Sequence, residues 1–145
     1  MYKAKKFRIV AEDSEIYSEK LNTPYSVIEY AKKVVNKDTI SIYESFYLIA
    51  INQNNNVLGY TTISNGSINN CSIDIRIICK YAIETLCTEV IIIHNHPSDN
   101  PKPSQNDIDI TKRIKEGLAI FDIQLVDHVI VTEHNHYSFA CEGML

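Results

Sequence analysis

The sequence lacks paired cysteines, long apolar runs and an excess of basic residues, and each absence excludes a class of protein. No C-x-x-C pair occurs among the four cysteines, and three of them lie in or beside one expected helix without sharing a face. We therefore expect reduced thiols in a cytoplasmic protein. No apolar run approaches the roughly 18 residues of a membrane helix, and MYKAKKFRIV at the N-terminus has no signal-peptide core, so no membrane association is expected.

Charge and length narrow the alternatives further. The net charge is -4 and the pI is about 5.7, so composition indicates no basic face, and direct non-specific DNA binding by this chain is not expected. At 145 residues and 45% apolar composition, the chain has the size of one domain that buries roughly 70% of its unfolded surface. It contains no repeat, low-complexity tract or dividing linker, so we expect one compact unit.

The N-terminal half predicts a strand, a helix and a hairpin. Residues 6–12 (KFRIVAE) predict a first strand, and Thr23-Pro24 is typical of a cap and first turn of a helix that runs through Val35. Two apolar, aromatic and β-branched runs at 45–52 and 57–64, separated by the Asn-rich QNNN, predict a hairpin with left-handed turn geometry.

The C-terminal half alternates helix and strand. Apolar residues at three- and four-residue spacing predict helices at Ile75–Leu86 and from Ile110 through Ile114 and Leu118 to Phe121. Val90–Ile93 has no polar face, which is typical of a central strand covered on both sides. QLVDHVIVT and HYSFAC predict a closing hairpin. These elements favour an α/β fold, a three-layer αβα sandwich with a mixed sheet.

The most informative stretch is HNHPSDNPKPSQND at residues 94–107. His94 and His96 stand two apart at the end of a strand, so their imidazoles project to one side from Cα atoms about 7 Å apart. Asp107 falls in the first turn of a helix expected to begin near Ser104, after a loop stiffened by three prolines. Two imidazoles, one carboxylate and an open position are typical of a catalytic zinc site.

Simpler interpretations exist for the same residues. Ser104-x-x-Asp107 also resembles a helix capping box, and taken alone this interpretation is favoured over catalysis. A His-x-His pair in a loop is usually solvated. His134-x-His136 repeats the H-N-H spelling in an expected turn with no third ligand nearby, so a metal role is not expected there. The combination of His-x-His, rigid loop and Ser-x-x-Asp is therefore the specific signal at 94–107.

This combination resembles a known signature. His94-x-His96, seven residues, Ser104, two residues and Asp107 match the H-x-H-x7-S-x-x-D pattern of the JAMM (JAB/MPN) metalloprotease superfamily. HNHPS, then PS and D, then LVDHVIV resemble one bacterial branch, the RadC-like proteins. The similarity covers roughly residues 37–141. Where that branch usually has glycine, this chain has Asp99, which tolerates left-handed geometry better than most residues.

The resemblance implies a fold and a set of roles. The fold would be a JAB/MPN domain related to the cytidine deaminases, with residues 37–145 as the metallohydrolase domain and residues 1–36 packed on it. His94, His96 and Asp107 would bind one Zn²⁺ per chain. Glu44, which on sequence alone is a solvated charge at a strand edge, would be the general acid/base, and Ser104 would donate a hydrogen bond to the tetrahedral oxyanion.

The same resemblance suggests a supporting residue and a missing region. Asp127 in LVDHVIV matches the RadC-like pattern and would orient a ligand histidine, although a buried aspartate satisfied by backbone donors is about equally plausible. Full-length RadC-like proteins carry an N-terminal helix-hairpin-helix region associated with DNA, and we expect none in the segment at 1–36. The historical DNA-repair label of that family is therefore hard to transfer.

Three functions follow from these residues. The leading hypothesis is a zinc-dependent hydrolase that cleaves a peptide or isopeptide bond in an unidentified peptide or protein substrate. The second is a non-catalytic scaffold or DNA-processing accessory that keeps the fold. The third, a metal-dependent nuclease, would require a basic groove that the composition does not indicate. The sequence leaves the substrate, the oligomeric state and the choice of zinc over another divalent metal open.

Overall fold

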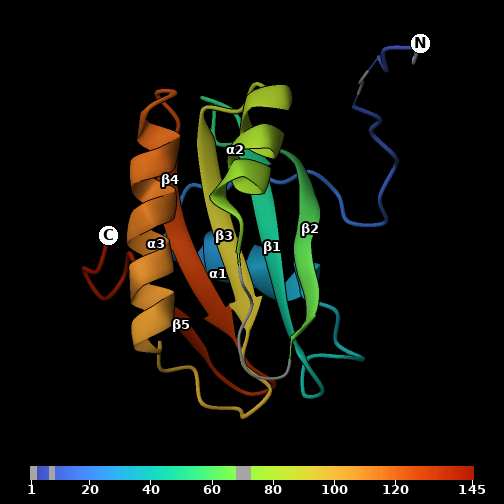
Figure 1. The fold of residues 1–145 in the computed structure, drawn as a ribbon. Helices are drawn as coiled ribbons and strands as arrows, with labels where there is room; N and C mark the ends of the chain where they lie inside the picture. The colour runs from blue at the N-terminus through green and yellow to red at the C-terminus, as the bar shows by residue number, and fades with distance from the viewer. Residues whose placement is uncertain (1–2, 7–8, 68–72) are drawn as a thin grey trace.

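The computed structural model of the chain describes residues 3–6, 9–67 and 73–145. These residues form three helices and five strands (Figure 1). The helices are α1 (Pro24–Val34), α2 (Ile75–Glu84) and α3 (Gln105–Ala119); the strands are β1 (Glu44–Ile51), β2 (Val57–Ser67), β3 (Glu89–Asn95), β4 (Gln124–Val131) and β5 (His136–Ser138). Of the described helices, none is long and apolar enough to cross a membrane.

The strands form one mixed sheet with the order β2-β1-β3-β4-β5. β3 lies at its centre, antiparallel to β1 and parallel to β4, and the other neighbouring pairs are antiparallel. The parallel connection from β3 to β4 runs through the proline-containing loop and α3. Because of this crossover, the start of α3 returns to the end of β3, where the two histidines of HNHPS are found.

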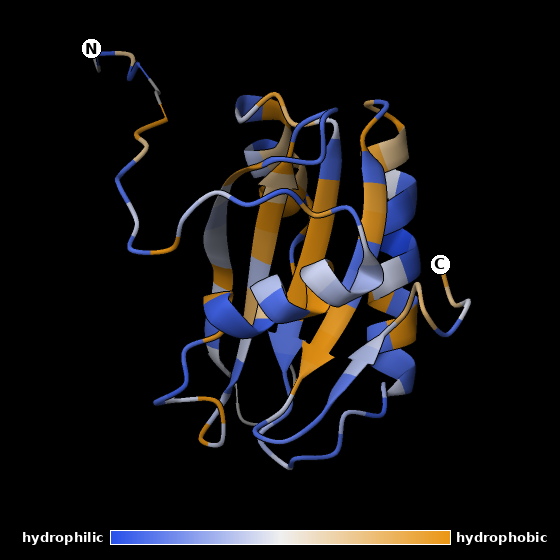
Figure 2. Cartoon of the chain, turned by 180° about the vertical axis from the view of Figure 1, so that it is seen from behind, coloured by the Kyte–Doolittle hydropathy of each residue, from blue (hydrophilic) through white to orange (hydrophobic). Residues whose placement is uncertain are grey.

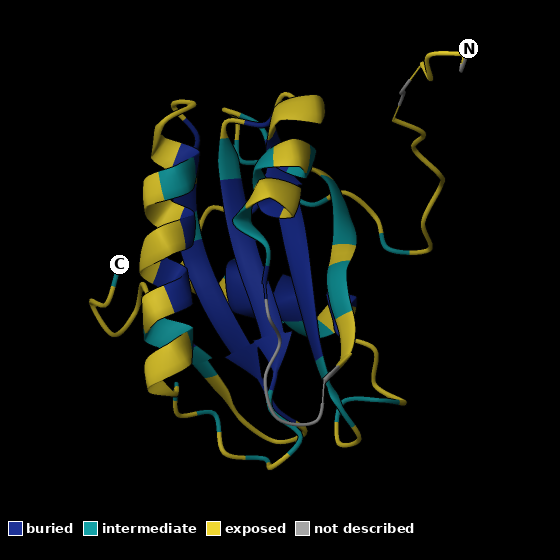
Figure 3. Ribbon diagram, viewed as in Figure 1, coloured by how far each residue is buried: buried dark blue, intermediate teal, exposed yellow. Residues whose placement is uncertain are grey.

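Helices cover both faces of the sheet, so the predicted three-layer α/β architecture is confirmed. α1 lies behind the sheet in Figure 1 and crosses in front of it in the reverse view of Figure 2, while α2 and α3 cover the opposite face. Successive side chains of β3 point to opposite faces of the sheet and pack into two separate cores. Ile91 and Ile93 pack in the core beneath α1, and Val90 and Ile92 pack in the core beneath α2 and α3. β1, β3 and β4 are accordingly buried along most of their length (Figure 3).

Local sequence signals explain several element boundaries. Thr23 caps α1 with its side chain and Pro24 occupies the first turn, as predicted, and Ile28, Ala31 and Val35 are buried against the sheet. The β1–β2 hairpin is also confirmed, and Asn55 in its turn adopts the left-handed conformation with φ 61°.

Predictions from the sequence are wrong at the N-terminal strand and at the ends of two helices. Residues 9–12 form no strand, and Ile9 and Val10 are exposed. A strand needs a neighbouring strand to pair its backbone N–H and C=O groups, and this segment has none among the described residues. Residues 7 and 8 of that predicted strand lie outside the described residues. The helical patterns that were extended to Leu86 and Phe121 also fail at those residues. α2 ends at Glu84 and α3 ends at Ala119, and the side chains of Leu86 and Phe121 are exposed.

Candidate metal centre

Two histidines at the end of β3 point toward one another on the α3 side of the sheet. Alternation places His94 and His96 on the face covered by α3 and the intervening Asn95 on the opposite face. The Nε2 atoms of His94 and His96 are 2.9 Å apart. His94 is buried and His96 is half-buried. The end of β3 thus presents two imidazole nitrogens to one point.

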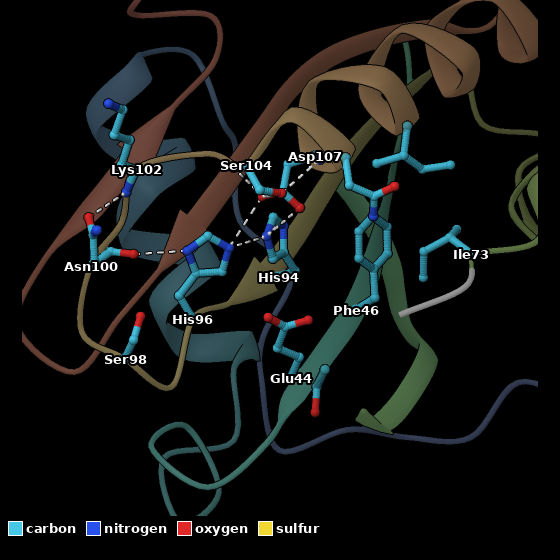
Figure 4. Close-up of a pocket in the computed structure, with 13 residues that line it drawn as sticks. Glu44, Phe46, Ile73, His94, His96, Ser98, Asn100, Lys102, Ser104 and Asp107 are labelled. Carbon is cyan, nitrogen blue, oxygen red and sulfur yellow. Dashed lines mark hydrogen bonds and ion pairs between the residues drawn. The ribbon is translucent and has the colours of Figure 1, made fainter. Parts of the chain in front are cut away.

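Asp107 brings a carboxylate to the same point from the first turn of α3. Its Oδ1 lies 3.3 Å from His94 Nε2 and its Oδ2 lies 3.4 Å from His96 Nε2 (Figure 4). In the part of the chain that the structure describes, this is the one group of three ligand side chains that can hold a metal ion. The three predicted ligands, separated by up to 13 positions in sequence, therefore converge.

Asp107 also completes the helix cap that the sequence suggested as an alternative. Ser104 N and Ser104 Oγ both donate to Asp107 Oδ2, each at 2.7 Å, and Asp107 N lies 3.2 Å from Ser104 Oγ. The capping box is thus present in full. The two interpretations do not exclude one another, because the cap holds the carboxylate where the histidines meet it.

Hydrogen bonds on the far side of each ring fix which nitrogen faces the cluster. His96 Nδ1 lies 2.8 Å from the backbone carbonyl of Asn100, so it donates to that carbonyl and turns Nε2 toward His94 and Asp107. His94 Nδ1 lies 2.7 Å from Nε2 of His128. Both ligand rings are therefore anchored through Nδ1 and turn Nε2 toward Asp107.

The electrostatics of the cluster keep a carboxylate beside the imidazoles. Burial alone would raise the pKa of Asp107, but contacts with His94, His96 and Ser104 outweigh it and hold the pKa well below its usual range. For His96, burial would lower the pKa, and the contacts with Asp107 and the Asn100 carbonyl outweigh burial and raise it. The site is thus built to keep an anionic ligand, as a cation-binding site requires.

Glu44 lies at the start of β1 and lines the same pocket. The pocket has a volume of about 300 Å³, and its walls include Glu44, His94, His96, Ser104 and Asp107. Figure 4 shows the Glu44 carboxylate below the two histidines, and its charge contributes to the raised pKa of His96. Glu44, which the sequence alone predicted to be a solvated charge, therefore lies beside the ligand cluster.

Asn95, the residue between the two histidines, holds the segment that carries Glu44. Its amide donates to the backbone carbonyls of Ile40 and Tyr43, each at 2.8 Å, and its Oδ1 accepts from Ser45 N at 2.8 Å. Asn95 is buried, so these bonds are shielded from water. This role was not predicted from the sequence, although a polar residue in a buried strand needs hydrogen-bond partners.

His128 is a second residue that sequence reasoning missed. It is fully buried on β4, contacts His94 through Nε2, and places Nδ1 2.6 Å from Thr111 Oγ1. Burial, followed by the nearby His94, holds the pKa of His128 well below its usual value, so the ring is neutral. The signal available in the sequence was a histidine inside an apolar strand.

Asp127, the predicted supporting residue, has other partners. Its carboxylate accepts hydrogen bonds from Ser138 Oγ at 2.6 Å and from the backbone N–H groups of Ala140 and His128. Burial raises the pKa of Asp127 despite these donors. This carboxylate ties β4 to the end of β5, and the side chain of β4 that contacts a ligand histidine is His128.

The second H-N-H sequence takes part in an ion pair. His134 Nδ1 lies 2.9 Å from Asp99 Oδ2, and Asp99 adopts the left-handed conformation with φ 58° that was expected where the RadC-like pattern has glycine. No described group of three ligand side chains includes His134 or His136. The pair instead links the loop after His96 to the β4–β5 turn.

The cysteines are compatible with the predicted reduced state. Cys79, Cys87 and Cys141 are free thiols, and burial raises the pKa of both Cys79 and Cys87. Cys71 lies outside the described residues.

Comparisons with known proteins agree with the geometry. Residues 21–144 match the family model described as "RadC-like JAB domain". A UPF0758 protein of Flavobacterium johnsoniae is 35% identical over 127 residues, covering 81% of this chain and 56% of that protein. UPF0758 proteins of Fusobacterium nucleatum and Thermotoga maritima are 33% and 35% identical, over 91% and 88% of this chain and 61% and 55% of theirs. The chain thus spans little more than half the length of these relatives.

Proposed function

Because the chain belongs to the RadC-like JAB domain family, we propose that it is a zinc-dependent hydrolase that cleaves a peptide or isopeptide bond. The observation that carries the proposal is the convergence of His94, His96 and Asp107 on one point, beside Glu44 and at the wall of a pocket. A helix cap alone would require neither the two histidines nor the glutamate.

The donor set fits zinc. Two imidazole nitrogens and one carboxylate oxygen suit this ion, and three protein ligands leave a fourth position for water or substrate, as catalytic zinc sites do. His94, His96 and Asp107 would hold the ion, and both histidines already direct Nε2 toward the carboxylate. When bound, zinc polarises a carbonyl and lowers the pKa of a water molecule to about 7.

The remaining residues have distinct tasks in such a reaction. Glu44, which lines the pocket beside the histidines, would take a proton from the attacking water and deliver it to the leaving amine, which is general acid/base catalysis. The Ser104 hydroxyl lines the pocket and can turn from Asp107 Oδ2 toward an oxyanion that develops at the scissile carbonyl. Asn95 fixes the backbone before and after Glu44, which limits the positions its carboxylate can adopt.

The substrate class is inferred from the family and from the shape of the site. The pocket is open at the surface and lined mostly by polar side chains, which suits an extended polar chain better than a small apolar ligand. A peptide or the ε-linked amide of an isopeptide can present its carbonyl to His94 and His96 from this opening.

The proposal is tested with zinc-loaded protein and two fluorogenic libraries, one of linear peptides and one of ε-linked lysine peptides. Wild-type protein is expected to hydrolyse members of at least one library, and Glu44→Gln to lose about 100-fold or more of that rate while keeping zinc. Glu116→Gln, an exposed carboxylate on α3, is the matched control and should remain active. Zinc-loaded wild type that cleaves neither library would favour the scaffold hypothesis.

A further inference from the structure

Three hydrogen bonds in series link the two elements that carry the candidate ligands. The Thr111 hydroxyl donates to the backbone carbonyl of Asp107, 2.5 Å away. The same oxygen lies 2.6 Å from Nδ1 of His128, and Nε2 of His128 lies 2.7 Å from Nδ1 of His94. The chain of contacts therefore runs from α3 through β4 to β3 and begins and ends at residues of the ligand cluster.

The direction of each hydrogen bond follows from the first. A carbonyl oxygen can only accept, so the single proton of the Thr111 hydroxyl is directed at Asp107. Thr111 Oγ1 must then accept from His128, which places a proton on Nδ1 of that ring. A neutral imidazole carries one proton, so Nε2 of His128 is an acceptor and His94 Nδ1 must donate to it.

We propose that Thr111 and His128 are positioning residues that select the Nδ1–H tautomer of His94 and so leave its Nε2 lone pair free for a metal ion. This inference rests on the proposed metal site. It adds a reason for the presence of a histidine in the buried centre of β4, where an apolar residue would pack as well.

The opposite arrangement would disable the ligand. If His128 carried its proton on Nε2, it would donate to His94 Nδ1, and the His94 proton would then occupy Nε2, the atom that faces Asp107. Metal binding would first require that proton to leave. The Thr111 hydroxyl therefore controls the state of His94 from two hydrogen bonds away.

Ring stacking supports the hydrogen bonds that join Thr111, His128 and His94. The His128 ring stacks on Phe139 at 4.8 Å between ring centroids, and the His94 ring stacks on Phe46 at 5.6 Å. Phe46 also meets the edge of His128. These aromatic contacts cover the ring faces and leave the ring nitrogens to form the hydrogen bonds.

The first test reads the tautomers directly in the metal-free protein. Long-range ¹H–¹⁵N correlation spectra of ¹⁵N-histidine-labelled wild type should show both His94 and His128 as Nδ1–H tautomers. A proton on Nε2 of His94 in the wild type would overturn the proposal. This measurement needs no variant and no activity, so it decides the inference separately from the proposed function.

The second test removes only the hydroxyl. Thr111→Val should move His94 toward the Nε2–H tautomer and weaken zinc binding by about 10- to 100-fold in competition with a chromophoric chelator, as changes behind a metal ligand typically do. Thr111→Ser restores the oxygen and should restore both properties. An unchanged tautomer and unchanged zinc affinity in Thr111→Val would contradict the proposal.

A matched control separates positioning from stability. Ser138→Ala removes another buried hydroxyl, which donates to Asp127 and is not part of the hydrogen-bonded series from Thr111 to His94. It should lower the melting temperature without changing the His94 tautomer or the zinc affinity. If Ser138→Ala shifted the tautomer as strongly as Thr111→Val, the specific role of Thr111 would be overturned. Absence of zinc binding in the wild type would instead remove the proposed function.

Discussion

At the scale of single residues, Asp107 belongs to two arrangements that depend on different atoms and properties. The cap requires an acceptor for Ser104 N, whereas the ligand cluster requires a negative charge between two imidazoles. Substitutions can therefore separate the two roles.

Ser104→Ala and Asp107→Asn should have opposite effects on stability and metal content. Ser104→Ala removes the side-chain cap of α3 and should reduce the free energy of unfolding by about 1 kcal/mol while zinc is retained. Asp107→Asn keeps an acceptor for Ser104 N but loses the charge, so zinc should be lost with little change in the stability of the metal-free protein. Urea denaturation and metal analysis of each variant check both expectations.

The ion pair between His134 and Asp99 should make stability depend on pH. The hydrogen bond to Asp99 raises the pKa of His134, and contacts with Thr132 and His134 lower the pKa of Asp99. The pair is therefore complete from roughly pH 4 to pH 6.5, between the ordinary values of the two groups. Its contribution decreases as the pH rises through the raised pKa of His134 or falls through the lowered pKa of Asp99.

Thermal unfolding of His134→Ala across this range measures the effect. The melting temperature of the variant should fall furthest below that of the wild type near pH 5.5 and approach it above the raised pKa of His134. His136→Ala, two residues along the same turn, should show no such pH-dependent difference. A destabilisation by His134→Ala that is constant from pH 5 to pH 9 would contradict the ion pair.

The sequence predicted the residues of the cluster better than the residues behind them. His94, His96 and Asp107 could be found because a strand end, a stiff loop and a helix start constrain their positions along the chain. Asn95 and His128 could not, since their partners at Tyr43 and Thr111 are distant or unremarkable in sequence and only the packed sheet brings them together.

At the scale of elements, the end of α2 contains a residue poorly suited to its backbone conformation. Leu86 follows the C-cap Thr85 and adopts φ 53°, a left-handed geometry that favours glycine. Its side chain is 84% exposed, so little packing compensates for the unfavourable conformation.

Leu86→Gly should therefore stabilise the protein by about 1 kcal/mol, the usual cost of a non-glycine residue in this conformation. Leu86→Ala is the matched control, because it removes the same exposed side chain but keeps a Cβ atom at positive φ. Urea denaturation should show a gain for glycine only. Equal stability of the two variants would contradict the assigned strain.

Periodicity in the sequence predicted the interiors of elements and failed at their ends. Apolar spacing placed α2, β3 and α3 correctly because each buries a stripe or face against the sheet. Phe121 continues the spacing of α3, yet the chain leaves the helix there and turns at Asp122, which has φ 57°. Backbone geometry at that turn decides the end of the helix, and side-chain spacing contains no information about it.

At the scale of the whole molecule, the three layers explain why the site forms where it does. The parallel crossover from β3 through α3 to β4 brings a strand end and a helix start together, while β1 supplies Glu44 from the other side of β3. The predicted fold class indicated a mixed sheet but not the order of its strands. The α/β alternation was readable in the sequence, whereas the pairing of β1 with β3 was not.

The metal content of the purified protein decides whether His94, His96 and Asp107 bind zinc. Protein purified without a histidine tag should contain about one zinc per chain by plasma emission spectroscopy. His96→Ala should lose it, and His134→Ala, in the other H-N-H sequence, should keep it. A wild-type protein that contains no zinc and takes up none when zinc is added would rule out the zinc site and leave Ser104 and Asp107 as a helix cap.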